Sequence, residues 1–136
     1  MIVYRRSIRF EEVDAARIVF FARYLNFAHE AMESFFEGLE GGYATLITGR
    51  QVGLPAVDVK MRFFAPVRYG ETLSIETSTG RLGTRSAVLH YRMLKADAVV
   101  AAEVEHTVVT TDLQRMVSVE MPADVRDIFS EHLVRS

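Results

Sequence analysis

One stretch of the sequence decides the fold, and it reads Ala22-Arg-Tyr-Leu-Asn-Phe-Ala-His-Glu-Ala-Met-Glu-Ser-Phe-Phe-Glu-Gly-Leu39. Its apolar residues recur at three- and four-residue spacing, and they are Leu25, Ala28, Met32, Phe35, Phe36 and Leu39. Such spacing predicts an amphipathic helix of about five turns with one apolar stripe. The Gly41-Gly42 pair tolerates positive φ and indicates where this helix ends, and residues 43–49 predict a further short helical turn.

Alternating apolar and polar residues lie on both sides of this helix. In residues 2–11, apolar residues lie at alternate positions, and they are Ile2, Tyr4, Ile8 and Phe10. This alternation predicts a first strand with one buried face. A loop over residues 12–21 follows. Beyond Gly53, turn residues separate four longer runs, which span 56–64, 72–82, 85–95 and 98–111. Consecutive strands joined by tight turns predict an antiparallel sheet.

Two of these runs carry an apolar row along one face. The first row consists of Val57, Val59, Met61 and Phe63, and the second of Val100, Ala102, Val104, His106 and Val108. One face of the sheet is therefore expected to be apolar. Residues 123–133 predict a short C-terminal helix, because Val125, Ile128, Phe129 and Leu133 recur at helical spacing.

The order of these elements indicates the fold class. One long helix between a strand and a four-stranded meander buries its apolar stripe well by lying across the concave face of a curved sheet. The sequence thus predicts an α+β hotdog fold, with a five- to six-stranded curved antiparallel sheet wrapped around one long helix and a short C-terminal helix. A four-plus-one-stranded sheet with one helix also fits other α+β folds. We expect a single domain over residues 1–136.

Composition limits the functional classes. The formal net charge is −2 and the charges are interleaved, so neither a nucleic-acid partner nor an anionic membrane surface is expected. Cysteine is absent, which excludes disulfides and a thiol nucleophile. The alternating start does not resemble a signal peptide, and apolar runs fall far short of the roughly 20 residues of a membrane span. We expect a cytoplasmic protein without a membrane span.

The sharpest local motif joins the first strand to the long helix, and it reads Phe10-Glu-Glu-Val-Asp14-Ala-Ala-Arg-Ile-Val-Phe-Phe-Ala-Arg-Tyr24. A carboxylate just before a helix can act as a base or nucleophile on an acyl carbonyl. Free amides in the first helical turn can stabilise the oxyanion that develops. Asp14 also fits a simpler role as a capping or loop carboxylate. Glu12, the second acid, is expected to be solvated.

This motif resembles the signature of the 4-hydroxybenzoyl-CoA thioesterase family of hotdog proteins, which includes Tol-Pal-associated thioesterases. The resemblance implies that Asp14 is the catalytic carboxylate, that the backbone N–H of Phe21 polarises the thioester, and that coenzyme A is part of the substrate rather than a cofactor. It extends over the strand near 57–63 to Ser86, and implies substrate-binding roles for Arg17, Tyr24, Val59, Met61, Arg81, Arg85 and Ser86. Residues 81–86 fit a solvated hairpin turn equally well.

Arg17 is a departure from this resemblance, because the family usually has glycine there. Glycine allows positive φ and close ligand approach. The loop therefore either avoids positive φ here, or the geometry of the site differs. Arg17 could contact the thioester or the phosphates of coenzyme A, although a surface or ion-paired arginine is the more common case.

The predicted function is hydrolysis of a small aromatic or short-chain acyl-CoA thioester. The protein is expected to be a homo-oligomer, either a dimer or a tetramer built from dimers, with each site shared between two subunits. One alternative is hydration or dehydration of an acyl thioester, but no histidine follows Asp14 at loop distance. The other is a non-catalytic acyl-CoA-binding module. No metal site is expected, because His29 lacks a second histidine four residues later. His90 and His106 could face each other on neighbouring strands, although a packed role is the better interpretation.

Overall fold

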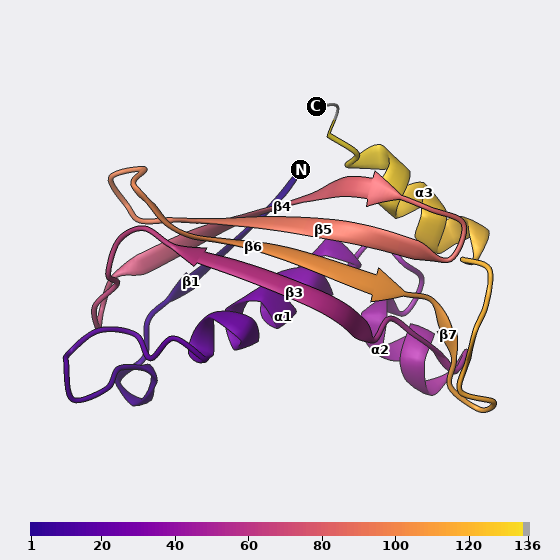
Figure 1. Ribbon diagram of the computed structural model, residues 1–136, viewed down its shortest axis with the longest axis horizontal. Coiled ribbons are helices and arrows are strands. Elements are labelled where there is room, and N and C mark those ends of the chain that lie inside the picture. Colours follow the sequence, from indigo (N-terminus) through magenta and orange to yellow (C-terminus); the bar gives the residue numbers. More distant parts are fainter. Residues whose placement is uncertain (135–136) are drawn as a thin grey trace.

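The computed structural model describes residues 1–134 and has the predicted hotdog architecture. A curved antiparallel sheet with strand order β1-β4-β5-β6-β3 wraps around helix α1 (Arg23–Phe35) (Figure 1). Its strands are β1 (Ile2–Ser7), β3 (Ala56–Phe63), β4 (Thr72–Leu82), β5 (Ser86–Leu94) and β6 (Val100–Val109). A short helix, α3 (Ala123–Glu131), packs at the end of the sheet where β4 finishes.

Smaller elements complete the chain. A 3-10 helix, η1 (Phe10–Glu12), follows β1, and helix α2 (Gly42–Thr48) follows α1 as expected. A second sheet, which the sequence did not predict, has the order β2 (Val52–Gly53), β7 (Thr111–Asp112) and β8 (Val117–Ser118). These strands have two residues each, too short for an alternation pattern to reveal.

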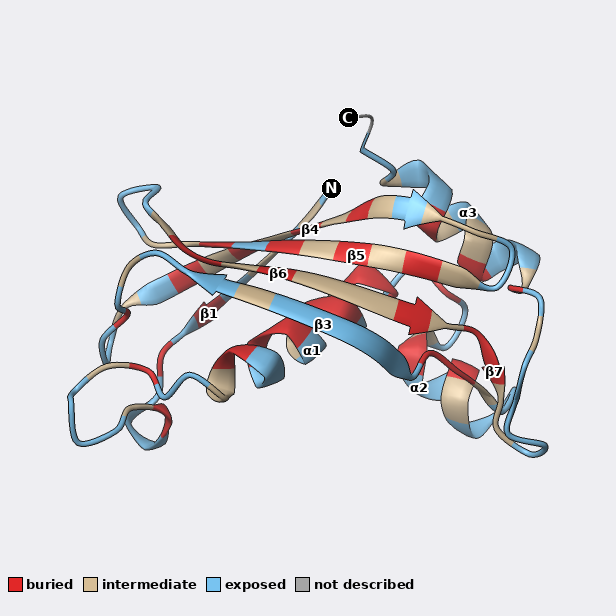
Figure 2. Ribbon diagram, viewed as in Figure 1, coloured by how far each residue is buried: buried red, intermediate tan, exposed pale blue. Residues whose placement is uncertain are grey.

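The core lies between α1 and the concave face of the sheet (Figure 2). Ala28, Met32 and Phe35 of the predicted stripe are buried, but Leu25 is 46% exposed. The buried face of α1 also includes Phe27 and Ala31, which are fully inaccessible to solvent. It packs against the inward row of the central strands, which includes Leu73, Ile75, Leu89, Tyr91 and Val104. Apolar burial of this kind is the main source of stability, and it fixes where the helix begins relative to the sheet.

The helix is shorter than its apolar spacing predicted, because α1 ends at Phe35 rather than at Leu39. Phe36 leaves the helix and packs its ring against Phe129 of α3 and Tyr43 of α2, with centroid distances of 5.3 Å and 5.7 Å. This tertiary contact outweighs the local helical pattern. Gly41 and Gly42 both have positive φ, at 78° and 71°, and they form the turn into α2.

One expectation about the strands was wrong. The first strand ends at Ser7 instead of continuing to residue 11, because the chain turns into η1. The apolar residues of β3 are not buried as a row, since every residue of that strand except Met61 is exposed (Figure 2). The strand lies at the edge of the sheet, with β6 as its one neighbour among residues 1–134.

The two histidines of the central strands do not face each other, contrary to the possibility raised by the sequence. His90 lies opposite Glu105 and His106 lies opposite Leu89, so their side chains are on different faces of the sheet. The His90 ring covers Gly80 on the outer face, where a β-carbon would overlap it. His106 is on the inner face, within hydrogen-bonding distance of Tyr91. Within residues 1–134, no helix has the length and apolar character needed to cross a membrane.

Candidate active site

The loop between η1 and α1 is closed by its own backbone. Val13 and Val19 form an antiparallel bridge, and the Asp14 N–H donates to the Ile18 carbonyl at 3.0 Å. The Val19 N–H donates to the Val67 carbonyl at 2.8 Å, which ties the loop to the segment after β3. Asp14 and the start of α1 therefore belong to one compact hydrogen-bonded unit.

Asp14 presents one free carboxylate oxygen. The side chain is exposed, and its Oδ1 accepts a hydrogen bond from the Ala16 N–H at 2.8 Å, which makes an Asx turn. Within residues 1–134, Oδ2 has no hydrogen-bond partner. The turn fixes the orientation of the carboxylate and leaves Oδ2 available for chemistry.

The residues before α1 supply a free backbone donor. Phe21 accepts a hydrogen bond from the Tyr24 N–H at 3.3 Å through its carbonyl, but its own N–H makes no backbone hydrogen bond within residues 1–134. Unpaired amides at a helix N-terminus carry the positive end of the helix dipole and favour negative charge. The Phe21 amide can therefore stabilise an oxyanion.

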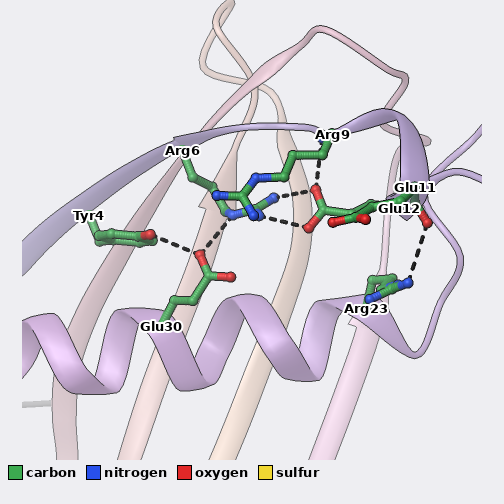
Figure 3. A network of polar contacts seen from close by, with 7 residues as sticks. All are labelled: Tyr4, Arg6, Arg9, Glu11, Glu12, Arg23 and Glu30. Carbon is green, nitrogen blue, oxygen red and sulfur yellow. Dashed lines mark hydrogen bonds and ion pairs between the residues drawn. The ribbon is translucent and has the colours of Figure 1, made fainter.

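A buried ion-pair network anchors the loop (Figure 3). The Arg6 guanidinium donates to both carboxylate oxygens of Glu12 at 2.7 Å, and its Nε donates to Glu30 Oε1 of α1 at 2.8 Å. Tyr4 donates to the same Glu30 oxygen at 2.8 Å. The Arg6 guanidinium also lies 4.1 Å from the centre of the Phe27 ring, as in a cation–π contact. The network thus joins β1, η1 and α1.

Glu12 holds both ends of the loop. Its side chain accepts a hydrogen bond from the Arg9 N–H at 2.8 Å, and its carbonyl accepts one from the Phe20 N–H at 3.0 Å. Burial would raise the pKa of Glu12, but the hydrogen bonds from Arg6 and the Arg9 amide outweigh it, so the pKa lies below its ordinary value. The expectation that Glu12 is solvated was wrong, since the residue is only 5% exposed.

Arg17 adopts the backbone conformation that its side chain disfavours. Its φ is +68°, in the left-handed region where glycine is preferred. The loop does not avoid positive φ at this position, so the first explanation offered for this departure from the family pattern was wrong. The Arg17 N–H donates to the Asp14 carbonyl at 2.9 Å, which closes the turn beside the carboxylate.

The remaining sequence-predicted site residues fall into two groups. Tyr24 is buried and packs its ring against Phe63 of β3 at 5.2 Å, while Val59 and Met61 lie further along that strand. Arg81, Arg85 and Ser86 lie at the opposite end of the sheet. β4 has 11 residues between the Asp14 end and that turn, a length of about 35 Å.

Within one chain, the structure therefore does not bring the Arg81–Ser86 turn and Asp14 together. Arg85 is already engaged, since its Nη1 donates to the carbonyl and the hydroxyl of Ser118, both at 3.1 Å. The ligand-binding roles of this group stay predictions. Among residues 1–134, no three histidine, aspartate or glutamate side chains are grouped as metal ligands would be.

Sequence reasoning missed Arg6 and Glu30. Arg6 shares the parity of Ile2, Tyr4 and Ile8, which is the buried parity of β1, and an arginine at such a position signals a buried partner. The identity of the partners depends on the packing of α1 against β1, which the one-dimensional pattern does not contain.

Known proteins resemble this chain in sequence and structure. A family model described as the thioesterase-like superfamily matches residues 8–129. A 1,4-dihydroxy-2-naphthoyl-CoA hydrolase of Nostoc punctiforme is 32% identical over 98 residues, which cover 72% of this chain and 66% of that protein. The structure of a thioesterase superfamily protein from Jannaschia sp. CCS1 has a TM-score of 0.91 at 26% identity, covering 98% of this chain and 94% of that chain. That of a gentisyl-coenzyme A thioesterase has a TM-score of 0.82 at 27% identity, covering 91% and 98%.

The family match extends from the residue after β1 into α3, so it includes the Asp14 loop, the central helix and the whole meander. The narrower resemblance to 4-hydroxybenzoyl-CoA thioesterases stays a prediction. From its fold and its sequence, the chain belongs to the thioesterase-like superfamily and has the hotdog fold.

Proposed function

We propose that this protein is an acyl-CoA thioesterase that hydrolyses an aromatic acyl-CoA to the free acid and coenzyme A in the cytoplasm. Asp14 supplies the catalytic carboxylate, and the Phe21 amide stabilises the oxyanion. Coenzyme A is part of the substrate, and the reaction takes no cofactor. The observation that carries the proposal is the free Asp14 Oδ2 in a closed loop that leads to the unpaired Phe21 amide just before α1.

The chemistry follows from these two groups. Asp14 either takes a proton from a water molecule whose oxygen attacks the thioester carbonyl carbon, or attacks that carbon itself to give an acyl anhydride that water then hydrolyses. In both routes the carbonyl oxygen becomes negative and accepts the Phe21 hydrogen bond. The carbon–sulfur bond breaks, and the thiolate of coenzyme A leaves and takes up a proton.

The names of the relatives support an aromatic acyl group. The Nostoc relative is named for a dihydroxynaphthoyl thioester, and one structural neighbour is named for the gentisyl thioester. The inner surface of β3 offers Val59 and Met61 for an apolar ring. A short aliphatic acyl group would use the same surface less fully, because it buries less apolar area.

The edge of the sheet supports a shared site between two copies. β3 is exposed on both faces and carries apolar residues with an unpaired edge, which single chains usually protect. Two-fold pairing of β3 with itself would reverse the two ends of the sheet. The Asp14 loop of one copy would then lie towards the Arg81–Ser86 end of the other, where basic side chains can bind the phosphates of coenzyme A.

The decisive experiment measures thiol release from benzoyl-, 4-hydroxybenzoyl-, 1,4-dihydroxy-2-naphthoyl- and short aliphatic CoA esters. We expect Asp14→Asn to lower kcat by about 10²–10⁴-fold on every ester that the wild type hydrolyses. Asp112→Asn is the matched control, because Asp112 Oδ1 makes the same Asx turn, with the Gln114 N–H at 2.9 Å, after β6. It should retain wild-type kcat.

Two outcomes would contradict the proposal. If Asp14→Asn keeps wild-type activity while remaining folded, Asp14 is a turn residue and another group performs the hydrolysis. If the wild type binds acyl-CoA tightly but releases no thiol from any ester, the chain is a binding module. Consumption of an enoyl-CoA without thiol release would indicate a hydratase instead.

A further inference from the structure

The inner face of the sheet carries one histidine among apolar residues. His106 of β6 lies directly opposite Val59 of β3, so the two side chains are neighbours on the face that contacts α1. The residues two positions away along β6 on either side are Val104 and Val108, both buried. His106 itself is only partly buried. It is therefore a polar group beside the strand to which we assign the acyl ring.

Tyr91 fixes which nitrogen of His106 carries the proton. The Tyr91 hydroxyl lies 3.1 Å from His106 Nδ1, and the two rings stack at 28° with their centres 6.0 Å apart. Tyr91 is fully buried, and burial raises its pKa far above the ordinary value, so the phenol keeps its proton. If Nδ1–H were the donor, that phenol hydrogen would be left unpaired in the interior, an arrangement that costs about 1–3 kcal/mol. Tyr91 therefore donates to Nδ1, and the proton of the imidazole is on Nε2.

Two effects favour the neutral form of the His106 imidazole. Burial lowers the pKa of His106, and the neighbouring His29 lowers it further, because two nearby positive charges repel each other. His29 lies on the exposed side of α1, edge-on to Tyr43 with ring centres 6.3 Å apart. Within residues 1–134, Nε2 of His106 has no hydrogen-bond partner. The site thus offers one neutral N–H donor in an aromatic environment.

We propose that His106, oriented by Tyr91, is a specificity-determining residue that donates a hydrogen bond from Nε2 to a hydroxyl oxygen on the acyl ring. The inference rests on the proposed thioesterase function, because it takes the acyl group to lie along Val59 and Met61. A neutral donor suits a neutral phenolic oxygen, and the apolar surroundings strengthen the bond. The substrate class is thereby narrowed to hydroxylated aromatic acyl thioesters.

The test compares two pairs of esters that differ only in ring hydroxyls, benzoyl- against 4-hydroxybenzoyl-CoA and 2-naphthoyl- against 1,4-dihydroxy-2-naphthoyl-CoA. In at least one pair, His106→Phe should lower kcat/KM for the hydroxylated ester about 10–100-fold, the size of one lost hydrogen bond, while the plain ester changes less than about 3-fold. Tyr91→Phe should also lower kcat/KM for the hydroxylated ester relative to the plain ester, but by less. Without the phenol, either nitrogen of His106 can carry the proton. His90→Phe, on the outer face of β5, is the control and should leave both esters unchanged.

Binding of the non-hydrolysable thioether analogues, followed by titration calorimetry, provides a readout that does not depend on turnover. If the wild type hydrolyses nothing, the proposed function fails, yet selective loss of hydroxylated-analogue binding in His106→Phe would still support this inference. Equal losses for the plain and hydroxylated forms would show that His106 only packs. No loss in either pair, or no analogue binding by the wild type, would also overturn the inference.

Discussion

The two edge strands of the sheet, β1 and β3, differ in which side chains they bury and which they expose. β1 buries a charged side chain, Arg6, which is paired with Glu12 and Glu30 (Figure 3). β3 exposes apolar side chains, among them Val57 at 60% and Phe63 at 49% (Figure 2). Each pattern reverses the usual location of charged and apolar residues. The charge that β1 buries finds its partners within one chain and supports the Asp14 loop, whereas the apolar side chains of β3 have the character of a surface that a second copy covers.

The largest expected effect comes from breaking the ion pair beneath the Asp14 loop. Arg6→Met removes the partner of Glu12, which is 5% exposed, and should lower the free energy of unfolding by about 3–5 kcal/mol. Arg50→Met is the matched control, because the Arg50–Asp124 pair at 2.6 Å lies near the surface and should contribute at most about 1 kcal/mol. Urea denaturation of both variants measures the difference. Equal losses of unfolding free energy in the two variants would show that the buried pair contributes no more to stability than the exposed pair.

The same variant has a pH signature. The pKa of Glu12 is lowered in the folded state, so its contribution to stability is present above the unfolded carboxyl pKa and is lost as pH falls through the folded value. Without Arg6, burial would instead raise the pKa of Glu12. Protonation of Glu12 would then remove the cost of an unpaired buried charge from the variant. The stability difference between wild type and Arg6→Met should therefore narrow as pH falls, first through the variant's raised pKa above about 4.5 and then through the wild type's lowered pKa below it. A constant difference across that range would mean that lost packing on Phe27 dominates.

The second prediction addresses the β3 edge. Val57→Lys should weaken self-association by about 10²-fold or more. Two-fold symmetry places the new lysine in the interface twice, and each charge would be buried there without a partner. Val3→Lys on β1, which replaces a valine that is 42% exposed, should leave assembly unchanged. Analytical ultracentrifugation over a concentration series distinguishes the two. Activity should fall together with the dimer, and an active Val57→Lys monomer would show that the site is complete in one chain.

The part of the site that depends on neighbouring residues could be predicted from the sequence. Asp14, the loop and the start of α1 form one continuous segment, so spacing alone indicated that a carboxylate precedes a helix N-terminus. The approximate bounds of the long strands also followed from alternation and turn residues. These features depend on interactions between residues close in sequence.

The part that joins distant elements could not be predicted. Arg6 and Glu30 are 24 residues apart, and their contact exists only because α1 packs on β1. The end of α1 was misplaced for the same reason, since Phe36 leaves the helix to reach Phe129. The opposite directions of His90 and His106 depend on the pairing register of β5 and β6. In each case tertiary packing decided between arrangements that the local sequence pattern does not distinguish.

The smallest expected effect concerns the strained residue of the loop that follows β1. Arg17 has a φ of +68°, which costs a side-chain-bearing residue about 1–2 kcal/mol. Arg17→Gly removes this strain but gives the unfolded chain more freedom, worth about 0.5–1 kcal/mol in the opposite direction. We expect a net stabilisation below about 1 kcal/mol in thermal unfolding. Arg17→Ala retains the β-carbon and should bring no gain, so equal stability of the two variants would show that the loop is not strained. If Arg17 also contacts the phosphates of coenzyme A, both variants should raise KM equally while kcat is unchanged, because Asp14 keeps its Asx turn with Ala16.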